Sequence, residues 1–230
     1  MVGRVARAML PGFGLAVAYA LAIIIGRASR VEGSQVSLVW PAAAVAVLWA
    51  LYARTLSRTA EVSHWVGLVA VTFLANLTTG ATVGLSAWFS LVNVALAGVT
   101  AGLLTHRGRT PVLREPGDLG RLVAAVAAGT VAAATLATIW FAHAGQHDLP
   151  QTFALFAIRN GVTVLAGVAV VMRLRDAQWR LPERSMARTL ETVACVAVIV
   201  VVFLRVFWVN PGHPNAFGVM LPALWVSLRY

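Results

Sequence analysis

The chain has 230 residues, of which 60% are hydrophobic and only 11% charged, and its mean hydropathy is +0.81. Since a soluble domain would carry about a quarter charged residues, the composition excludes a soluble enzyme or soluble binding domain. The net charge of +10 does not indicate nucleic-acid binding, because the 18 basic residues are all arginines and most of them cluster in short connections between apolar runs. That placement is typical of a membrane protein whose first partners are anionic membrane lipids.

Eight apolar segments follow one another along the chain, and each is interpreted as a helix. A helical span needs roughly 20 apolar residues to cross a hydrocarbon core about 30 Å thick. Within lipid the backbone polar groups must be paired inside the protein, which a helix achieves alone. The segments cover residues 8–26, 36–53, 64–80, 83–104, 122–144, 151–172, 186–209 and 215–228. The predicted fold class is an all-α, polytopic transmembrane helix bundle of these eight spans, forming a single domain over residues 1–230.

The arginines predict the orientation of the bundle. Fourteen of the 18 lie in the N-terminal segment, in the connections after the second, fourth and sixth spans, and at the C-terminus. The alternate connections hold only Arg27 and Arg30. Because basic residues accumulate on the cytoplasmic side, both termini are expected in the cytoplasm. Arg4 and Arg7 precede the first span, but no small-x-small cleavage site follows, so we expect an uncleaved helix.

Two spans have unusual sequences. Trp40-Pro41 falls in the outer third of the second span, where proline is expected to kink the helix. Such a kink beside an aromatic ring can shape a cavity, although packing alone explains it as well. The fifth span is nearly all small residues from Ala124 to Thr135, which predicts close helix approach and a central position in the bundle.

The sequence gives no sign of catalytic chemistry. It contains no hydrolase elbow, phosphate-binding loop, CxxC pair or HExxH motif, so we expect no enzymatic activity and no cofactor. None of the eight acidic residues lies in the middle of a predicted span. Ion-coupled transporters usually need such a carboxylate. This argues against a coupled transporter but leaves a simple permease open.

A weak metal signal occurs in one outer loop. His143 and His147 are spaced i, i+4, which would put them on one helical face where they could share a metal ion. Asp148 and His213 could complete the site, and the histidines could instead sense protons. The alternative interpretation is that they are solvated loop histidines.

Arg159 carries the strongest prediction of a ligand site. It lies about 12 Å along the sixth span, too deep for its side chain to reach the outer surface easily. An arginine at this depth costs about 2.5–3.5 kcal/mol, and no carboxylate is placed to pair with it. It is expected either to hold helices together or to mark an outward-opening polar cavity near Trp40 and Asn93, with backbone carbonyls near Pro41 among its acceptors. Asparagines inside spans form interhelical hydrogen bonds or contact ligand. The predicted ligand-binding residues are Arg159, Asn160, Asn93, Trp40 and Asn76.

Several of these segments resemble one family. Residues 39–48, with Trp40-Pro41, resemble the W-P-x-x-G-hydrophobic signature of MASE1 domains, the membrane-associated sensor domains of bacterial signalling proteins. Residues 73–77 and 90–98 resemble the next two asparagine-bearing spans, and residues 221–230 resemble the late P-x-x-x-W-x-x-x-R-aromatic stretch. The sequence departs from the family at Ala44, where glycine is usual, and in the sixth span, where many members have an acidic residue.

The resemblance implies a sensory input module in the bacterial cytoplasmic (inner) membrane. Its partners would be a cytoplasmic signalling output domain or partner protein and a second copy in a homodimer, to which the buried Arg159 adds an anionic small-molecule ligand. Family members commonly continue into further helices and an output domain, so this chain is expected to be a truncated or stand-alone relative. A small permease or the substrate-binding subunit of a transporter is the alternative function, and a scaffold that only anchors its partner is a third.

Overall fold

A computed structural model describes residues 2–29, 37, 39–109 and 112–176, together with single positions farther along the chain. These single positions are all helical and are Met186, Leu190, Val193, Ala194, Ala197, Val198 and Val201. The chain divides into two compact units, Met1–Ala177 and Gln178–Tyr230. The predicted spans 186–209 and 215–228 belong to the second unit and, apart from those single positions, lie outside the described residues.

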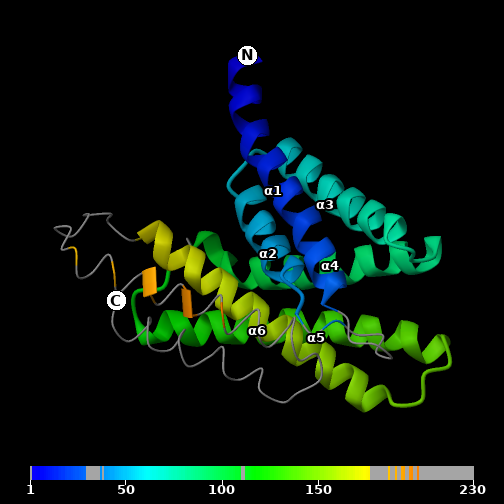
Figure 1. The fold of residues 1–230 in the computed structure, drawn as a ribbon. Coiled ribbons are helices and arrows are strands. Elements are labelled where there is room, and N and C mark those ends of the chain that lie inside the picture. The colour runs from blue at the N-terminus through cyan, green and yellow to red at the C-terminus, as the bar shows by residue number, and fades with distance from the viewer. Residues whose placement is uncertain are drawn as a thin grey trace. The chain divides into compact units, whose positions relative to one another are not determined.

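The first unit contains six α-helices and one short 3₁₀ helix (Figure 1). They are α1 (Val2–Ala28), α2 (Ala42–Ala53), α3 (Arg58–Thr78), α4 (Val83–Leu104), η1 (His106–Gly108), α5 (Pro116–His143) and α6 (Leu149–Asp176). The all-α prediction is confirmed, and the first and the third to sixth predicted spans each coincide with a helix. The structure supports five spans rather than eight, because five of the described helices are long and apolar enough to cross a membrane. By helix length and hydropathy the chain is a multi-pass membrane protein.

The second predicted span begins later than the sequence suggested. α2 starts at Ala42, directly after Pro41, which has a φ of −58° and a ψ of −25°. Proline has no N–H to donate and disfavours helical geometry in the residue before it, so a helix begins at proline more readily than it continues through it. The predicted kink inside a longer helix is therefore wrong. With its 12 residues α2 is only about 18 Å long, shorter than the hydrocarbon core.

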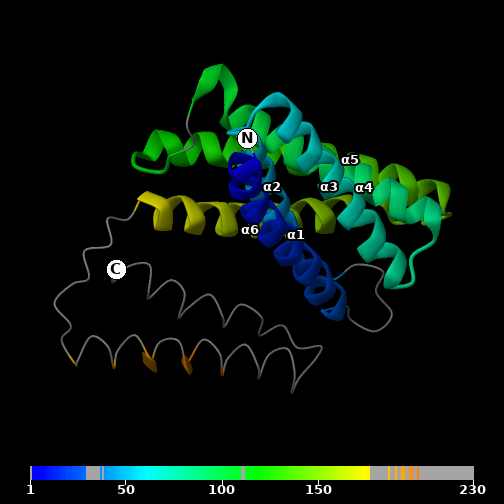
Figure 2. The same ribbon diagram turned by 90° about the horizontal axis from the view of Figure 1, so that it is seen from above.

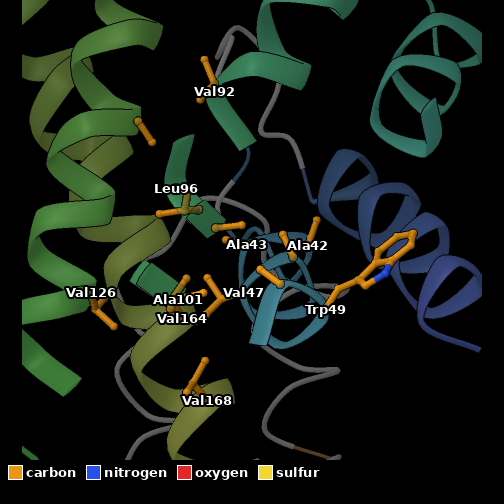
Figure 3. Packing of buried hydrophobic residues seen from close by; sticks show 14 of the residues in the cluster. Ala42, Ala43, Val47, Trp49, Val92, Leu96, Ala101, Val126, Val164 and Val168 are labelled. Carbon is orange, nitrogen blue, oxygen red and sulfur yellow. The ribbon is translucent and has the colours of Figure 1, made fainter. Parts of the chain in front are cut away.

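α2 occupies the centre of the first unit. It packs against α1, α3, α4 and α6, and eight of its 12 residues are buried. Its side chains are apolar on every side, as expected for a helix surrounded by protein. Figure 3 shows Ala43 and Val47 pointing toward Leu96 of α4 and Val164 of α6, whereas Trp49 projects away from them toward α1.

The small residues of α5 let it approach α4 closely. A Cβ atom added at Gly129 would overlap the Thr100 hydroxyl and lie 2.9 Å from the carbonyl oxygen of Leu96. Nearby, the Trp88 indole N–H donates to the Leu136 carbonyl at 2.8 Å. The predicted central position of α5 is nevertheless wrong, since α5 packs mainly against α4 and α6. Small side chains set how closely two helices approach, but not how many helices surround them.

The α3–α4 and α5–α6 pairs are joined at the same end of the first unit. The α3–α4 turn has Gly80 at a φ of +91°, a left-handed conformation that favours glycine. Thr82 begins α4 by accepting a hydrogen bond from the Leu85 N–H at 3.3 Å. In Figures 1 and 2 both connections lie on the right, away from the α4–α5 connection. We call this the turn end of the unit and the other the opposite end.

Candidate ligand-binding site

A small cavity of about 80 Å³ lies at the turn end of the first unit and is partly enclosed. Its polar lining comes from Arg27 at the end of α1, Ser37, Asn76 near the end of α3, Asn93 of α4 and Arg159 of α6. Four segments far apart in the sequence thus meet α6 at one place. We call this space the Arg159 cavity.

The apolar lining is mainly aromatic. It consists of Trp40, Leu85, Phe89, Phe141 and Phe156. The ring centroid of Phe89 lies 6.1 Å from that of Phe141 and 6.2 Å from that of Phe156, so rings from α4, α5 and α6 form one wall. Leu85 and Phe89 are four residues apart in α4, and the same spacing leads on to Asn93. One face of α4 therefore contributes both apolar and polar lining.

The guanidinium of Arg159 lies close to two aromatic side chains of the cavity. Its guanidinium carbon is 5.4 Å from the ring centroid of Trp40 and 4.9 Å from that of Phe156, within the range of a cation–π interaction. One terminal nitrogen donates to the Ser37 carbonyl at 3.1 Å. Ser37 lies four residues before Pro41, in the region where the sequence predicted a backbone acceptor. The Nε atom is buried, and none of the described residues offers it an acceptor.

Trp40 is held against α1 by its neighbours. The Ser29 hydroxyl donates to the carbonyls of Gly26 and Val39, at 2.7 and 3.1 Å, and accepts a bond from the Val39 N–H. This fixes the chain just before Trp40 to the end of α1. The indole then lies on Gly26, where an added Cβ would be 2.6 Å from a ring carbon. The absence of a side chain at Gly26 therefore positions the ring that stacks on Arg159.

Asn76 and Asn93 use their amide groups in the same way. The Asn76 Nδ2 donates to the Thr72 carbonyl at 2.9 Å, and the Asn93 Nδ2 donates to the Phe89 carbonyl at 2.9 Å. Each bond runs to the residue four positions earlier in the same helix. Both asparagines are buried. The sequence suggested hydrogen bonds between helices, but these two bonds each stay within one helix.

The predicted site residues do not all come together. Arg159, Trp40, Asn93 and Asn76 line one cavity, whereas Asn160 does not. Successive residues of a helix point about 100° apart, and Asn160 is buried on another side of α6, with 1% of its surface exposed. Its Nδ2 donates to the Phe156 carbonyl at 2.8 Å, and none of the described residues pairs with its Oδ1. Whether the four lining residues bind a ligand remains a prediction.

Sequence reasoning missed Arg27 and the phenylalanines. Arg27 donates from a terminal nitrogen to the Thr79 hydroxyl, which ties the end of α1 to the end of α3. The sequence did set Arg27 apart, because the connections after the first, third and fifth predicted spans contain no arginine except Arg27 and Arg30. Phe89, Phe141 and Phe156 gave no signal, because phenylalanine is ordinary in an apolar span.

The histidine pair does not lie on one helical face as predicted. α5 ends at His143, and Gly145 turns the chain at a φ of +80° before His147. Glycine in a left-handed conformation commonly terminates a helix, so the i, i+4 spacing has no helical meaning here. Within the part of the chain that the structure describes, no group of three or more His, Cys, Asp or Glu side chains could hold a metal ion. His213 lies outside the described residues.

The electrostatics of the cavity suit an anion. Two guanidinium groups, Arg27 and Arg159, line it, and no carboxylate is among the described lining residues. Arginine stays charged and presents several N–H donors in one plane, which makes it the usual partner of carboxylates and phosphates. The same described lining contains no nucleophile paired with a general base.

Comparison of the chain with family models, curated proteins and solved structures finds no match. Fold and composition define the chain as a helical, multi-pass membrane protein.

Proposed function

We propose that the chain is a membrane-embedded sensory input module that binds a small anion in the Arg159 cavity and relays a change in helix packing to a signalling partner. The observation that carries the proposal is the guanidinium of Arg159 within a partly open cavity, with a buried Nε that the described residues leave unpaired. A buried charge of this kind is costly unless something satisfies it, and an anionic ligand would do so.

The composition of the cavity wall supports a relay of this kind. α1, α3, α4, α5 and α6 each contribute at least one lining residue, and the connection before α2 contributes Ser37 and Trp40. A ligand held between them would favour one relative arrangement of these helices. Because a helix moves as a rigid rod, a shift at the cavity also displaces its opposite end. At the opposite end, α2, α6 and the α4–α5 connection line a second crevice of about 710 Å³.

The membrane orientation belongs to the same proposal. The α1–α2, α3–α4 and α5–α6 connections hold two arginines, Arg27 and Arg30. The α2–α3 and α4–α5 connections, at the opposite end, hold most of the others between the described helices. Under the positive-inside rule the cavity then opens to the outside of a bacterial inner membrane, and the relay ends in the cytoplasm. The resemblance to MASE1 sensor domains supports this proposal through its motifs alone, since no family model matches the chain.

The first experiment tests binding. The full chain, purified in a neutral detergent, is titrated calorimetrically with acetate, propionate, lactate and inorganic phosphate. At least one should bind to the wild type, and Arg159→Gln should abolish that binding while Arg159→Lys keeps part of it. Arg121→Gln is the matched control, because Arg121 is largely exposed at the opposite end and pairs only with Asp118 among the described residues. Equal binding by wild type and Arg159→Gln would contradict the proposal.

The second experiment separates sensing from transport. Spin labels at Ser57→Cys and Gly117→Cys, in a Cys195→Ser background, report a distance at the opposite end. Ser57 is exposed and makes no capping bond through its side chain, and a Cβ at Gly117 meets nothing within 4 Å, so both sites tolerate a label. Binding of the anion should change this distance. In a separate assay, proteoliposomes that contain the chain should take up no anion. Uptake of the anion into proteoliposomes would instead identify a permease, and an unchanged distance would contradict the relay.

A further inference from the structure

We propose that the Arg159 cavity recognises a small carboxylate that carries a hydrogen-bond donor, either a hydroxyl or an ammonium group, beside the carboxylate. This inference rests on the proposed function, because it concerns the same cavity and names the class of its ligand. The cavity offers unused donors and unused acceptors from different helices, so a simple anion satisfies only half of it.

The donors lie on α6. Of the Arg159 guanidinium, one terminal nitrogen is committed to the Ser37 carbonyl, and Nε has no acceptor among the described residues. Nε and a terminal nitrogen on the same side of a guanidinium form the fork that binds both oxygens of a carboxylate. The ring centroids of Trp40 and Phe156 lie 5.4 and 4.9 Å from the guanidinium carbon, so aromatic rings take up part of the space around the guanidinium.

The acceptors lie on α3 and α4. The partner of each asparagine amide is a backbone carbonyl oxygen, which only accepts, so Asn76 and Asn93 must present their NH₂ groups to Thr72 and Phe89. That choice leaves Oδ1 as the remaining group of each side chain. No hydrogen bond from the described residues reaches either Oδ1 atom. Two acceptors without donors, in a cavity already lined by two arginines, indicate a ligand that donates as well as accepts.

Size and lining limit the rest of the ligand. The cavity volume is about 80 Å³. This volume is enough for several waters, so it limits the ligand to a small acid of about three carbons. The rings of Phe89 and Phe141 offer an apolar surface to a methyl group and a negative face to an ammonium. A 2-hydroxy or 2-amino acid of about this size fits the lining in both respects.

The test compares three acids with the same number of carbons: propionate, lactate and alanine. Each is titrated calorimetrically into the full chain in lipid-free neutral detergent. Lactate and alanine should bind about five- to tenfold more tightly than propionate, the usual effect of one hydrogen bond to a buried acceptor. Asn93→Leu should bring that ratio close to one, and Asn76→Leu serves if Asn93→Leu does not fold.

Asn160→Leu is the matched control. Asn160 makes the same bond to a carbonyl four residues earlier and is as deeply buried, but it does not line the cavity. If Asn160→Leu lowers the ratio as much as Asn93→Leu, the effect is structural and the inference is overturned. Equal binding of all three acids that still requires Arg159 overturns the inference but leaves the proposed function standing. Binding of none of them overturns the inference, and the proposed function falls with it if acetate and inorganic phosphate do not bind either.

The serine headgroup of a phospholipid carries the same carboxylate and ammonium, so the source of the ligand needs its own arm. The lactate titration is repeated in phosphatidylcholine nanodiscs with and without phosphatidylserine. Unchanged lactate affinity in both supports a free acid as the ligand. Loss of lactate binding when phosphatidylserine is present would assign the site to the lipid headgroup and overturn the assignment to a free molecule.

Discussion

Gly129→Ala tests the close approach of α4 and α5. The methyl group would overlap the Thr100 hydroxyl and lie 2.9 Å from the Leu96 carbonyl oxygen. The Thr100 side chain can rotate away, but the carbonyl belongs to the α4 backbone and cannot. The two helices must therefore separate by several tenths of an ångström. A matched control lies in the same helix at Gly120, where an added Cβ meets nothing within 4 Å.

The two substitutions share one energetic contribution and differ in another. Replacing glycine by alanine inside a helix is favourable by about 1 kcal/mol, and this applies to both positions. Gly129→Ala additionally introduces overpacking, which costs about 1–3 kcal/mol. The difference between the two variants therefore isolates the overpacking. We expect Gly120→Ala to raise the free energy of unfolding by about 1 kcal/mol and Gly129→Ala to lie about 1–3 kcal/mol below it.

The assay is reversible unfolding of the purified chain in mixed detergent micelles, followed by tryptophan fluorescence. Thr100→Ala combined with Gly129→Ala should recover part of the lost stability, because it removes the hydroxyl that the new methyl group meets. The coupling between the two changes should be of order 0.5–3 kcal/mol. The explanation is refuted if Gly129→Ala and Gly120→Ala change the free energy of unfolding equally, since α5 would then not be held against α4 at this glycine.

Three further outcomes follow from named contacts. Gly26→Ala should displace the Trp40 ring from Arg159 and weaken the proposed anion binding, measured by calorimetry, about two- to fivefold. This factor corresponds to the usual free energy of an exposed cation–π contact, and an unchanged affinity would contradict the prediction. Gly80→Ala should cost about 1–2 kcal/mol of unfolding free energy, because its φ is +91°; a neutral effect would show that the turn rearranges. Tyr19→Phe should cost about 0.6–1.7 kcal/mol of unfolding free energy by losing its 2.9 Å hydrogen bond to Thr72, and an unchanged unfolding free energy would show that this bond contributes nothing.

The positions of the helices were predictable because they depend on the length and polarity of apolar runs. The sequence also contained the start of α2, since Pro41 marks the beginning of a helix more often than its interior. Its central position was likewise readable, because residues 42–53 are apolar on every side and such a helix is surrounded by protein. The small residues of α5 were given too much weight. They report the separation from one neighbour, α4, and say nothing about the rest of the bundle.

The cavity was predictable only in part. Trp40 stands out because it directly precedes Pro41, and Arg159, Asn93 and Asn76 stand out because each places polar groups where lipid or apolar protein is expected. Asn160 stands out for the same reason, yet it faces away from the cavity. Depth along a span can be counted from the sequence, but the rotation of one helix relative to its neighbours depends on tertiary packing.

The short central helix explains why a cavity exists at the turn end at all. α2 begins at Ala42 and contacts α1, α3, α4 and α6 along its length. Before Ala42 these helices no longer surround a helix, and the space between them is filled by Ser37, Trp40 and the cavity itself. A regular span through Pro41 would have placed apolar side chains there and left Arg159 without its Ser37 acceptor. The proline at which α2 begins thus also leaves free the Ser37 carbonyl and the Trp40 ring that contact the guanidinium. The start of one helix and the position of a buried charge on another therefore have a common cause.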